Sequence, residues 1–94
     1  MPVTVIVPSV LAPASDGRTM FELPDGSVRS AGEALDAVAR QFPVLGRRLR
    51  DERGELRRHV NVYVAGEDVR RGGGLATPVA AGEEVLVIQS IAGG

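Results

Sequence analysis

The sequence predicts an α+β domain in which one main helix covers one face of a mixed sheet of four to five strands. Two apolar, β-branched segments lie near the ends of the chain, at residues 3–7 and 85–88, and such composition is typical of strands. Residues 60–64 alternate valine with asparagine and tyrosine, as in a half-buried strand. Between these segments, residues 31–42 carry an apolar stripe at helical spacing.

The first strand is predicted to form a hairpin with the segment that follows it. Residues 3–7 lie between Pro2 and Pro8, and residues 18–23 alternate loosely before a Pro-Asp-Gly turn at residues 24–26. Residues 13–17, which end in Asp16-Gly17, predict the connecting turn. We therefore expect the second strand to pair back on the first.

The main helix is predicted from its start signal, its stripe and its stop signal. Ser30 lies three residues before Glu33, the capping-box spacing in which each side chain accepts a hydrogen bond from the other residue's backbone N–H. The stripe consists of Ala34, Leu35, Val38, Ala39 and Phe42. Pro43 is expected to end the helix, because the residue before a proline is disfavoured in the helical region. Residues 44–49 are expected to add a short helical turn.

The second half of the chain reads as loops and short strands. Residues 47–58 mix arginines with carboxylates and predict a solvated loop around Gly54, with a partner-binding surface as the alternative. Residues 65–68 predict a turn, and Val69-Arg70 a short edge strand. The glycines at 72–74 predict a plain loop, since they lack the lysine and the strand–helix context of a phosphate-binding loop.

The order of elements favours the β-grasp, or ubiquitin-like, arrangement, with the two most apolar strands parallel in the centre of the sheet. Strand alternation places one set of side chains toward the helix. These are Val3, Val5, Val7, Val60, Val62, Val64, Val85 and Val87. The same alternation places Ile6, Tyr63, Leu86 and Ile88 on the opposite face, which has no predicted helix to cover it.

Composition excludes several classes of function. The 94 residues predict one domain over residues 1–90 followed by a tail over 91–94. The net charge of −1 gives no footprint for nucleic acid. With no cysteine and a single histidine, His59, neither a metal site nor a thiol nucleophile is expected. No segment predicts a membrane span or a signal peptide, so we expect a cytoplasmic protein. All 11 basic residues are arginines, so the chain offers no lysine side chain for an isopeptide bond.

The tail is the candidate functional group. Ile91, Ala92, Gly93 and Gly94 follow the last strand directly and end in a free carboxylate. Glycine has no Cβ, so such a tail is slim enough to thread a narrow active site of another protein. With two glycines and one alanine, the tail is also expected to be mobile when the protein is free.

Several motifs resemble one known family. They are Val-Asn-Val-Tyr-Val at 60–64, Glu-Asp-Val-Arg at 67–70, Gly-Gly-Leu-Ala-Thr at 73–77, Gly-Glu-Glu-Val at 82–85 and Ala-Gly-Gly at 92–94. With these motifs the chain resembles the bacterial ubiquitin-like sulfur carriers of the ThiS/MoaD/CysO group over nearly its whole length. The sequence from Arg71 to Thr77 is most similar to the CysO-like branch, which serves cysteine biosynthesis.

The resemblance implies a sulfur cycle at Gly94. A partner resembling ubiquitin-activating enzymes, an adenylyltransferase and sulfurtransferase, would use ATP to adenylate the carboxylate, and sulfide equivalents would convert it to a thiocarboxylate. A sulfur-accepting synthase would then draw the sulfur. This synthase would be a pyridoxal-phosphate-dependent cysteine synthase or a thiosugar-type synthase, and a metalloprotease that releases the product is a further implied partner. The chain itself would be a co-substrate with no catalytic residue and no bound cofactor.

Two other functions stay open on the residues alone. One is a protein modifier joined through Gly94 to target lysines, because the activation step is shared. The other is a plain β-grasp binding module. For a carrier or a modifier, we expect Ile6, Tyr63, Leu86 and Ile88 to dock on the partner enzymes, since contiguous apolar patches mark binding sites. The alternative is that loops 8–15 or 72–80 fold over this face.

Overall fold

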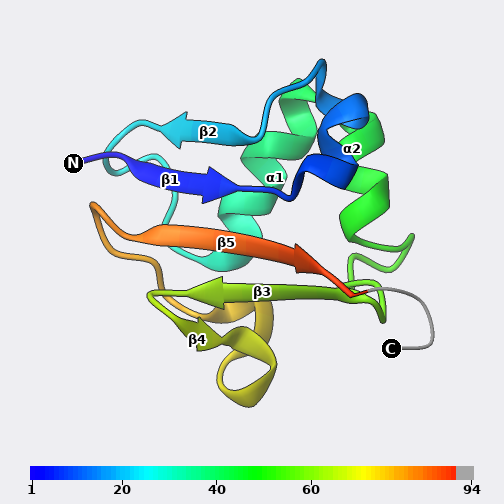
Figure 1. Cartoon of the computed structure of the whole chain (residues 1–94). Coiled ribbons are helices and arrows are strands. Elements are labelled where there is room, and N and C mark those ends of the chain that lie inside the picture. The colour runs from blue at the N-terminus through cyan, green and yellow to red at the C-terminus, as the bar shows by residue number, and fades with distance from the viewer. Residues whose placement is uncertain (91–94) are drawn as a thin grey trace.

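The computed structural model describes residues 1–90, which form one mixed sheet with helices packed on one face. The sheet has five strands in the order β2-β1-β5-β3-β4 (Figure 1). The strands are β1 (Val3–Ile6), β2 (Met20–Leu23), β3 (Val60–Val64), β4 (Glu67–Asp68) and β5 (Glu84–Gln89). The helices are α1 (Ala31–Gln41) and α2 (Pro43–Leu49), with 3-10 turns η1 (Ser9–Ser15), η2 (Val69–Arg71) and η3 (Gly74–Ala76).

The predicted pairing of the two most apolar strands is confirmed. β1 and β5 run parallel at the centre, with Ile6 opposite Leu86, while β2 and β3 flank them antiparallel. A parallel pair needs a crossover connection, and the chain between β1 and β5 supplies it through α1, α2 and β3. The result is the predicted β-grasp arrangement, in which the last strand lies inside the sheet.

The helix start is confirmed with one change in the cap. The Glu33 backbone N–H donates to Ser30 Oγ at 3.1 Å, as predicted. The Glu33 carboxylate, however, accepts from the Arg29 N–H at 2.9 Å instead of the Ser30 N–H. α1 ends at Gln41, and Pro43 opens α2, where a first-turn proline loses no helical hydrogen bond. Pro43 therefore separates two helices, because its ring stops the first and its fixed φ suits the start of the second.

Three local predictions were wrong in type or extent. The sequence predicts a loop over residues 8–15 and a turn over 13–17, whereas residues 9–15 form the 3-10 turn η1. Asp16 and Gly17 do reverse the chain, with positive φ values of 53° and 84°. β2 begins at Met20, not at residue 18. The edge strand falls at residues 67–68, in the predicted turn, and Val69–Arg71 instead forms η2, because the Asp68 side chain accepts from the Arg70 N–H and caps it.

The core lies between the sheet and the two α-helices. All eight valines predicted to face the helix are at most 5% exposed, and they pack with the apolar side of α1 and with Leu45 and Leu49 of α2. Burying a side chain of this size contributes about 1.5–3 kcal/mol. The sheet is therefore held to the helices by its valine face, which leaves its other face free.

The alternative that loops cover the opposite face is wrong. η1 packs against α2, and its Leu11 belongs to the core. η3 packs against α1, where the Ala31 N–H donates to the Thr77 carbonyl at 2.9 Å. Both segments thus lie on the helical side or at its edge, and within residues 1–90 no helix lies over the opposite face (Figure 1).

α1 and α2 approach each other closely at Gly46. A Cβ added to Gly46 would lie 2.5 Å from the Ala39 Cβ. We expect Gly46→Ala to destabilise the fold by about 1–3 kcal/mol, because the clash outweighs the helix-propensity gain of about 1 kcal/mol. Urea denaturation measures this change. The double variant Ala39→Gly/Gly46→Ala should recover part of the loss, whereas additive losses would contradict the contact.

Candidate functional site

The predicted reactive group, the carboxylate of Gly94, lies outside the described residues, as do Ile91, Ala92 and Gly93. The structure therefore describes the body from which the tail leaves. Ser90 is the last described residue and follows β5 directly. The geometry around Ser90 and the open sheet face define the candidate site.

The end of β5 is tied to β3 by a short hydrogen-bond chain. The Ser90 N–H donates to the His59 carbonyl at 2.8 Å, and Ser90 Oγ accepts from Asn61 Nδ2 at 3.2 Å. Asn61 Oδ1 in turn accepts from Arg70 Nη1 at 2.6 Å. Side chains of η2, of β3 and of Ser90, the residue directly after β5, thus meet at the point where the described chain ends. We call this chain, Arg70–Asn61–Ser90, the tail clamp.

The tail clamp was missed by sequence reasoning. Strand alternation does place Asn61 on the same face as Tyr63, so the position of Asn61 was predictable. The contact with Arg70 depends on η2 turning the chain back across β3, and no local pattern predicts that turn. The clamp also gives His59 a structural role through its backbone carbonyl, at the residue before β3.

The four residues predicted for docking do share the open face. Ile6, Leu86 and Tyr63 are direct neighbours across β1, β5 and β3 and form one row. Ile88 lies one pair further along β5, opposite Asn61 and next to the tail clamp. Ile88 is 41% exposed, and the other three are half-buried.

The apolar row extends one strand further than predicted. Met20 of β2 pairs with Ile6 and is 56% exposed, so the row runs Met20, Ile6, Leu86, Tyr63. The sequence signal for Met20 was weak because the alternation in residues 18–23 is loose. A row of four apolar side chains across four strands is a larger patch than scattered surface residues make.

The open face is hollowed beside this row. A hollow of about 510 Å³ lies over β3 and β5 and is lined by Tyr63, Ala65, Gly66, Glu84, Leu86 and Ile88. The hairpin that joins β3 to β4 forms one rim, with Ala65 and Gly66 at φ values of 51° and 85°. Two consecutive positive φ values are those of a tight type I′ turn. An apolar side chain of a partner therefore has both a surface and a depression to pack into.

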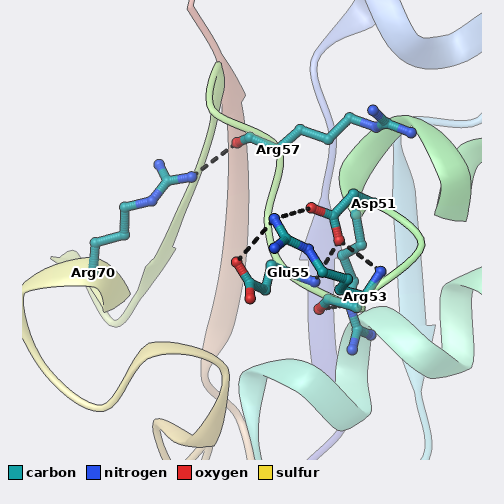
Figure 2. Close-up of polar contacts among 7 residues, drawn as sticks. Asp51, Arg53, Glu55, Arg57 and Arg70 are labelled. Carbon is teal, nitrogen blue, oxygen red and sulfur yellow. Dashed lines mark hydrogen bonds and ion pairs between the residues drawn. The ribbon is translucent and has the colours of Figure 1, made fainter.

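The arginine-rich segment, residues 50–58, is an ordered turn. Figure 2 shows Asp51 at its centre: the carboxylate accepts from the Arg53 N–H at 2.9 Å and the Glu55 N–H at 3.1 Å. The Arg53 guanidinium pairs with both Asp51 and Glu55, at 3.7 and 3.9 Å. Arg57 donates through Nε to the Arg47 carbonyl at 2.6 Å. The Arg57 carbonyl accepts from Arg70 Nη2 at 2.8 Å, as Figure 2 shows. The segment is thereby joined to both α2 and η2.

The backbone of this turn lowers the pKa of the Asp51 carboxyl. The backbone N–H of Glu55, followed by that of Arg53, stabilises the carboxylate and lowers the Asp51 pKa below its ordinary value of 3.8. Because the folded pKa lies below the unfolded one, the stabilisation is present above the unfolded pKa and is lost as pH falls through the folded pKa.

We expect the NMR titration of the Asp51 side-chain carboxyl carbon to have its midpoint below 3.8. An Arg53→Ala variant should keep most of the shift, since alanine retains the backbone N–H. A midpoint at or above the ordinary value in the parent protein would show that the turn does not hold the carboxylate as described.

Among residues 1–90, no three or more His, Asp or Glu side chains gather in a way that could hold a metal ion. None of the helices in that range is both long enough and apolar enough to cross a bilayer.

Comparison with known proteins agrees with the fold and with the motifs. The ThiS family model matches residues 11–94, and the chain belongs to this family. Sulfur carrier protein CysO of Mycobacterium tuberculosis is 39% identical over 100% of both chains. Small archaeal modifier protein 1 of Haloferax volcanii is 34% identical over 89% of this chain and 91% of its own.

Solved structures place the chain among ubiquitin-like β-grasp proteins. A chain in the crystal structure of the Amycolatopsis orientalis BexX/CysO complex superposes with a TM-score of 0.85 at 34% identity, covering 98% of this chain and 99% of its own. The crystal structure of Mycobacterium tuberculosis CysO gives a TM-score of 0.81 at 34% identity, covering 95% of this chain and 99% of its own. The predicted fold and family are therefore confirmed, and the CysO-like branch is among the matches.

Proposed function

We propose that this chain is a sulfur carrier protein whose Gly94 carboxylate is the group that carries sulfur. The strongest support is the similarity of this chain to sulfur carrier protein CysO of Mycobacterium tuberculosis, which is 39% identical over the entire length of both chains. This chain also belongs to the ThiS family and carries Gly-Gly at positions 93 and 94. A ubiquitin-like body on which the last strand leads directly into that tail supports the same function.

The chemistry is activation followed by substitution. A Gly94 carboxylate oxygen attacks the α-phosphorus of ATP, pyrophosphate leaves, and an acyl adenylate forms. A sulfide equivalent then attacks the acyl carbon and displaces AMP, which leaves a thiocarboxylate. Activation is necessary because a carboxylate is a poor electrophile until it gains a leaving group. The thiocarboxylate is a sulfur nucleophile that stays tethered to a protein and does not diffuse as free sulfide.

This chain positions the reactive carboxylate, and partner enzymes catalyse the reaction. The tail clamp holds the start of the tail, and four extended residues then reach about 13 to 14 Å beyond Ser90. Gly93 and Gly94 add no side chain that would block a narrow channel. The protein is thus a co-substrate with no cofactor of its own, and ATP is consumed by the activating partner.

The partners follow from this chemistry. The first is an adenylyltransferase that resembles ubiquitin-activating enzymes and also transfers sulfur. The second is a sulfur-accepting synthase, either a pyridoxal-phosphate-dependent cysteine synthase or a thiosugar-type enzyme, and a metalloprotease that releases the product is a third. The Amycolatopsis orientalis relative, seen in a BexX/CysO complex, supports binding of such a protein to a partner. The ATP requirement favours the cytoplasm as the place of action.

The open sheet face is the proposed docking surface. Ile6, Tyr63 and Leu86 form its row, and Ile88 lies between that row and the start of the tail. A partner that packs on this face receives the tail from its edge. Each buried apolar anchor of this kind contributes about 2 kcal/mol at an interface.

A protein modifier is the second candidate function, supported by the relative named small archaeal modifier protein 1. Its activation step is the same, and the two functions differ in the final acceptor. The chain has no lysine, so even as a modifier it could not extend into lysine-linked chains of itself.

The first test concerns the terminus. After incubation with the activating enzyme, ATP and a sulfide source, the intact mass of the parent protein should rise by one sulfur in place of one oxygen. A variant that lacks Gly94, or that ends one residue later, should show no gain, because the reacting carbon would be displaced. Conversion of the Gly94-deleted variant to a thiocarboxylate would contradict the proposal, and a heavier conjugate with a target protein would favour the modifier.

The second test concerns the open face. Ile88→Asp and Tyr63→Ala should each weaken binding to the activating enzyme, by roughly tenfold or more for a lost anchor of about 2 kcal/mol. Thermal unfolding should change little, because neither side chain belongs to the core. Calorimetric titration and thermal melts measure the two effects.

Val87→Asp is the matched control for this test. Val87 is the adjacent residue on β5 but is only 1% exposed, so an aspartate there should unfold the protein. If Ile88→Asp unfolds the protein equally, or binds as the parent does, the docking face is wrongly assigned.

A further inference from the structure

A second surface lies beside the start of the tail, on the helical side of the sheet. It is a groove of about 650 Å³ between η1, α2, the segment before β3 and the end of β5. Gln89, the last residue of β5, lines it, so the groove and the tail clamp are direct neighbours. We call it the arginine groove.

The arginine groove is positively charged and carries no carboxylate of its own. Arg47, Arg48 and Arg57 line it, and no acidic residue does. Among the described residues, no carboxylate lies within 4.0 Å of a nitrogen of these arginines; Asp51 and Glu55 of the neighbouring turn pair with Arg53, and Asp36 of α1 pairs with Arg50. Three guanidinium groups around one hollow repel each other, so a bound anionic group would relieve an existing cost.

One of these arginines is held in place before any partner arrives. Arg57 Nε donates to the Arg47 carbonyl at 2.6 Å. The Arg57 carbonyl accepts from Arg70 Nη2 at 2.8 Å (Figure 2). The Nε bond leaves the two terminal nitrogens of Arg57 available, the pair that binds a carboxylate in a fork geometry. A side chain that is already ordered loses less entropy on binding.

The rim of the groove is apolar. Val10 of η1 is 64% exposed and Val44 of α2 is 46% exposed, although both are valines on a folded domain. Arginine beside exposed apolar side chains is the composition of a protein interface, where arginine is enriched among residues that dominate binding. Two exposed valines would contribute nothing to the binding of a small free anion.

The position of the groove limits which partner proteins can contact it, and the choice of partner rests on the proposed function. An enzyme that takes Gly94 into its active site must come within about 13 to 14 Å of Ser90, the reach of four extended residues. The open sheet face and the arginine groove lie on opposite sides of that point. Every copy of the carrier must meet the activating enzyme before any acceptor, so this enzyme is the partner that the chemistry requires.

We infer that the arginine groove binds an acidic segment of the activating enzyme, with carboxylates on Arg47, Arg48 and Arg57 and an apolar residue between Val10 and Val44. The carrier would then be gripped on both sides of its tail: by apolar packing on the open sheet face and by charge pairing in the groove. Charge pairing of this kind accelerates association and makes it dependent on ionic strength.

The test is the affinity of the full chain for its activating enzyme, measured by calorimetric titration at low and at high salt. Arg47→Glu/Arg48→Glu should weaken binding by about tenfold or more at low salt. The matched control is Arg29→Glu/Arg71→Glu, which makes the same change in net charge with two exposed arginines outside the groove. It should change affinity less than about threefold. High salt should bring the parent protein close to the groove variant.

Further measurements test whether the variants are folded and whether the groove binds a small anion. Thermal melts of each variant show whether it is folded, and Val44→Glu, a single exposed change in the same groove, should weaken binding independently. Inorganic phosphate is titrated by NMR: if phosphate binds the groove while the groove variants keep full affinity for the enzyme, the surface is an anion site and the inference is overturned.

The remaining outcomes are also decisive. Equal losses in the groove variant and its control would show a general charge effect and overturn the inference. If the parent protein acquires sulfur normally and the groove variants bind like the parent, the inference fails while the proposed function stands. If the parent protein neither binds the activating enzyme nor acquires sulfur, both fail.

Discussion

The structure depends on the parallel pairing of β1 with β5. These strands come from opposite ends of the chain, so their contact closes the fold and encloses everything between them. Because the pair is parallel, the connection must cross the sheet, and the helices that make this crossing cover one face and bury its valines. The other face is left open for the same reason. The pairing also carries the C-terminal end of β5 to the same edge of the sheet as η1 and α2, which is why the tail starts beside the arginine groove.

Much of this arrangement could be predicted because its signals are local and strong. The valine runs of β1, β3 and β5 alternate with a period of two, and the α1 stripe follows its cap at a period of 3.6 residues. Together they decide which side of each strand is buried, and hence which residues share the open face. Ile6, Tyr63, Leu86 and Ile88 were placed correctly on that basis.

What could not be predicted depends on contacts between distant residues. Nothing near Arg70 in the sequence indicates that its side chain crosses β3 to reach Asn61, since this follows from the η2 turn that Asp68 caps. Residues 50–58 read as a solvated loop because alternating charges carry no period, yet the Asp51 carboxylate orders them. Arg47 and Arg57 become neighbours only because that turn is ordered. The sequence motifs led to the proposal for the reactive group, whereas the surfaces near the start of the tail had to be found in three dimensions.

The central position of β5 has a mechanical consequence. A pull on the tail acts along the axis of β5, and this strand is bonded on one side to β1 and on the other to β3. Such a force shears two hydrogen-bonded ladders at once, instead of opening one ladder bond by bond as it would at an edge strand. In the proposed function, a terminus drawn into an enzyme and withdrawn again would therefore leave the sheet paired. A carrier that is used many times needs that resistance as much as it needs a slim tail.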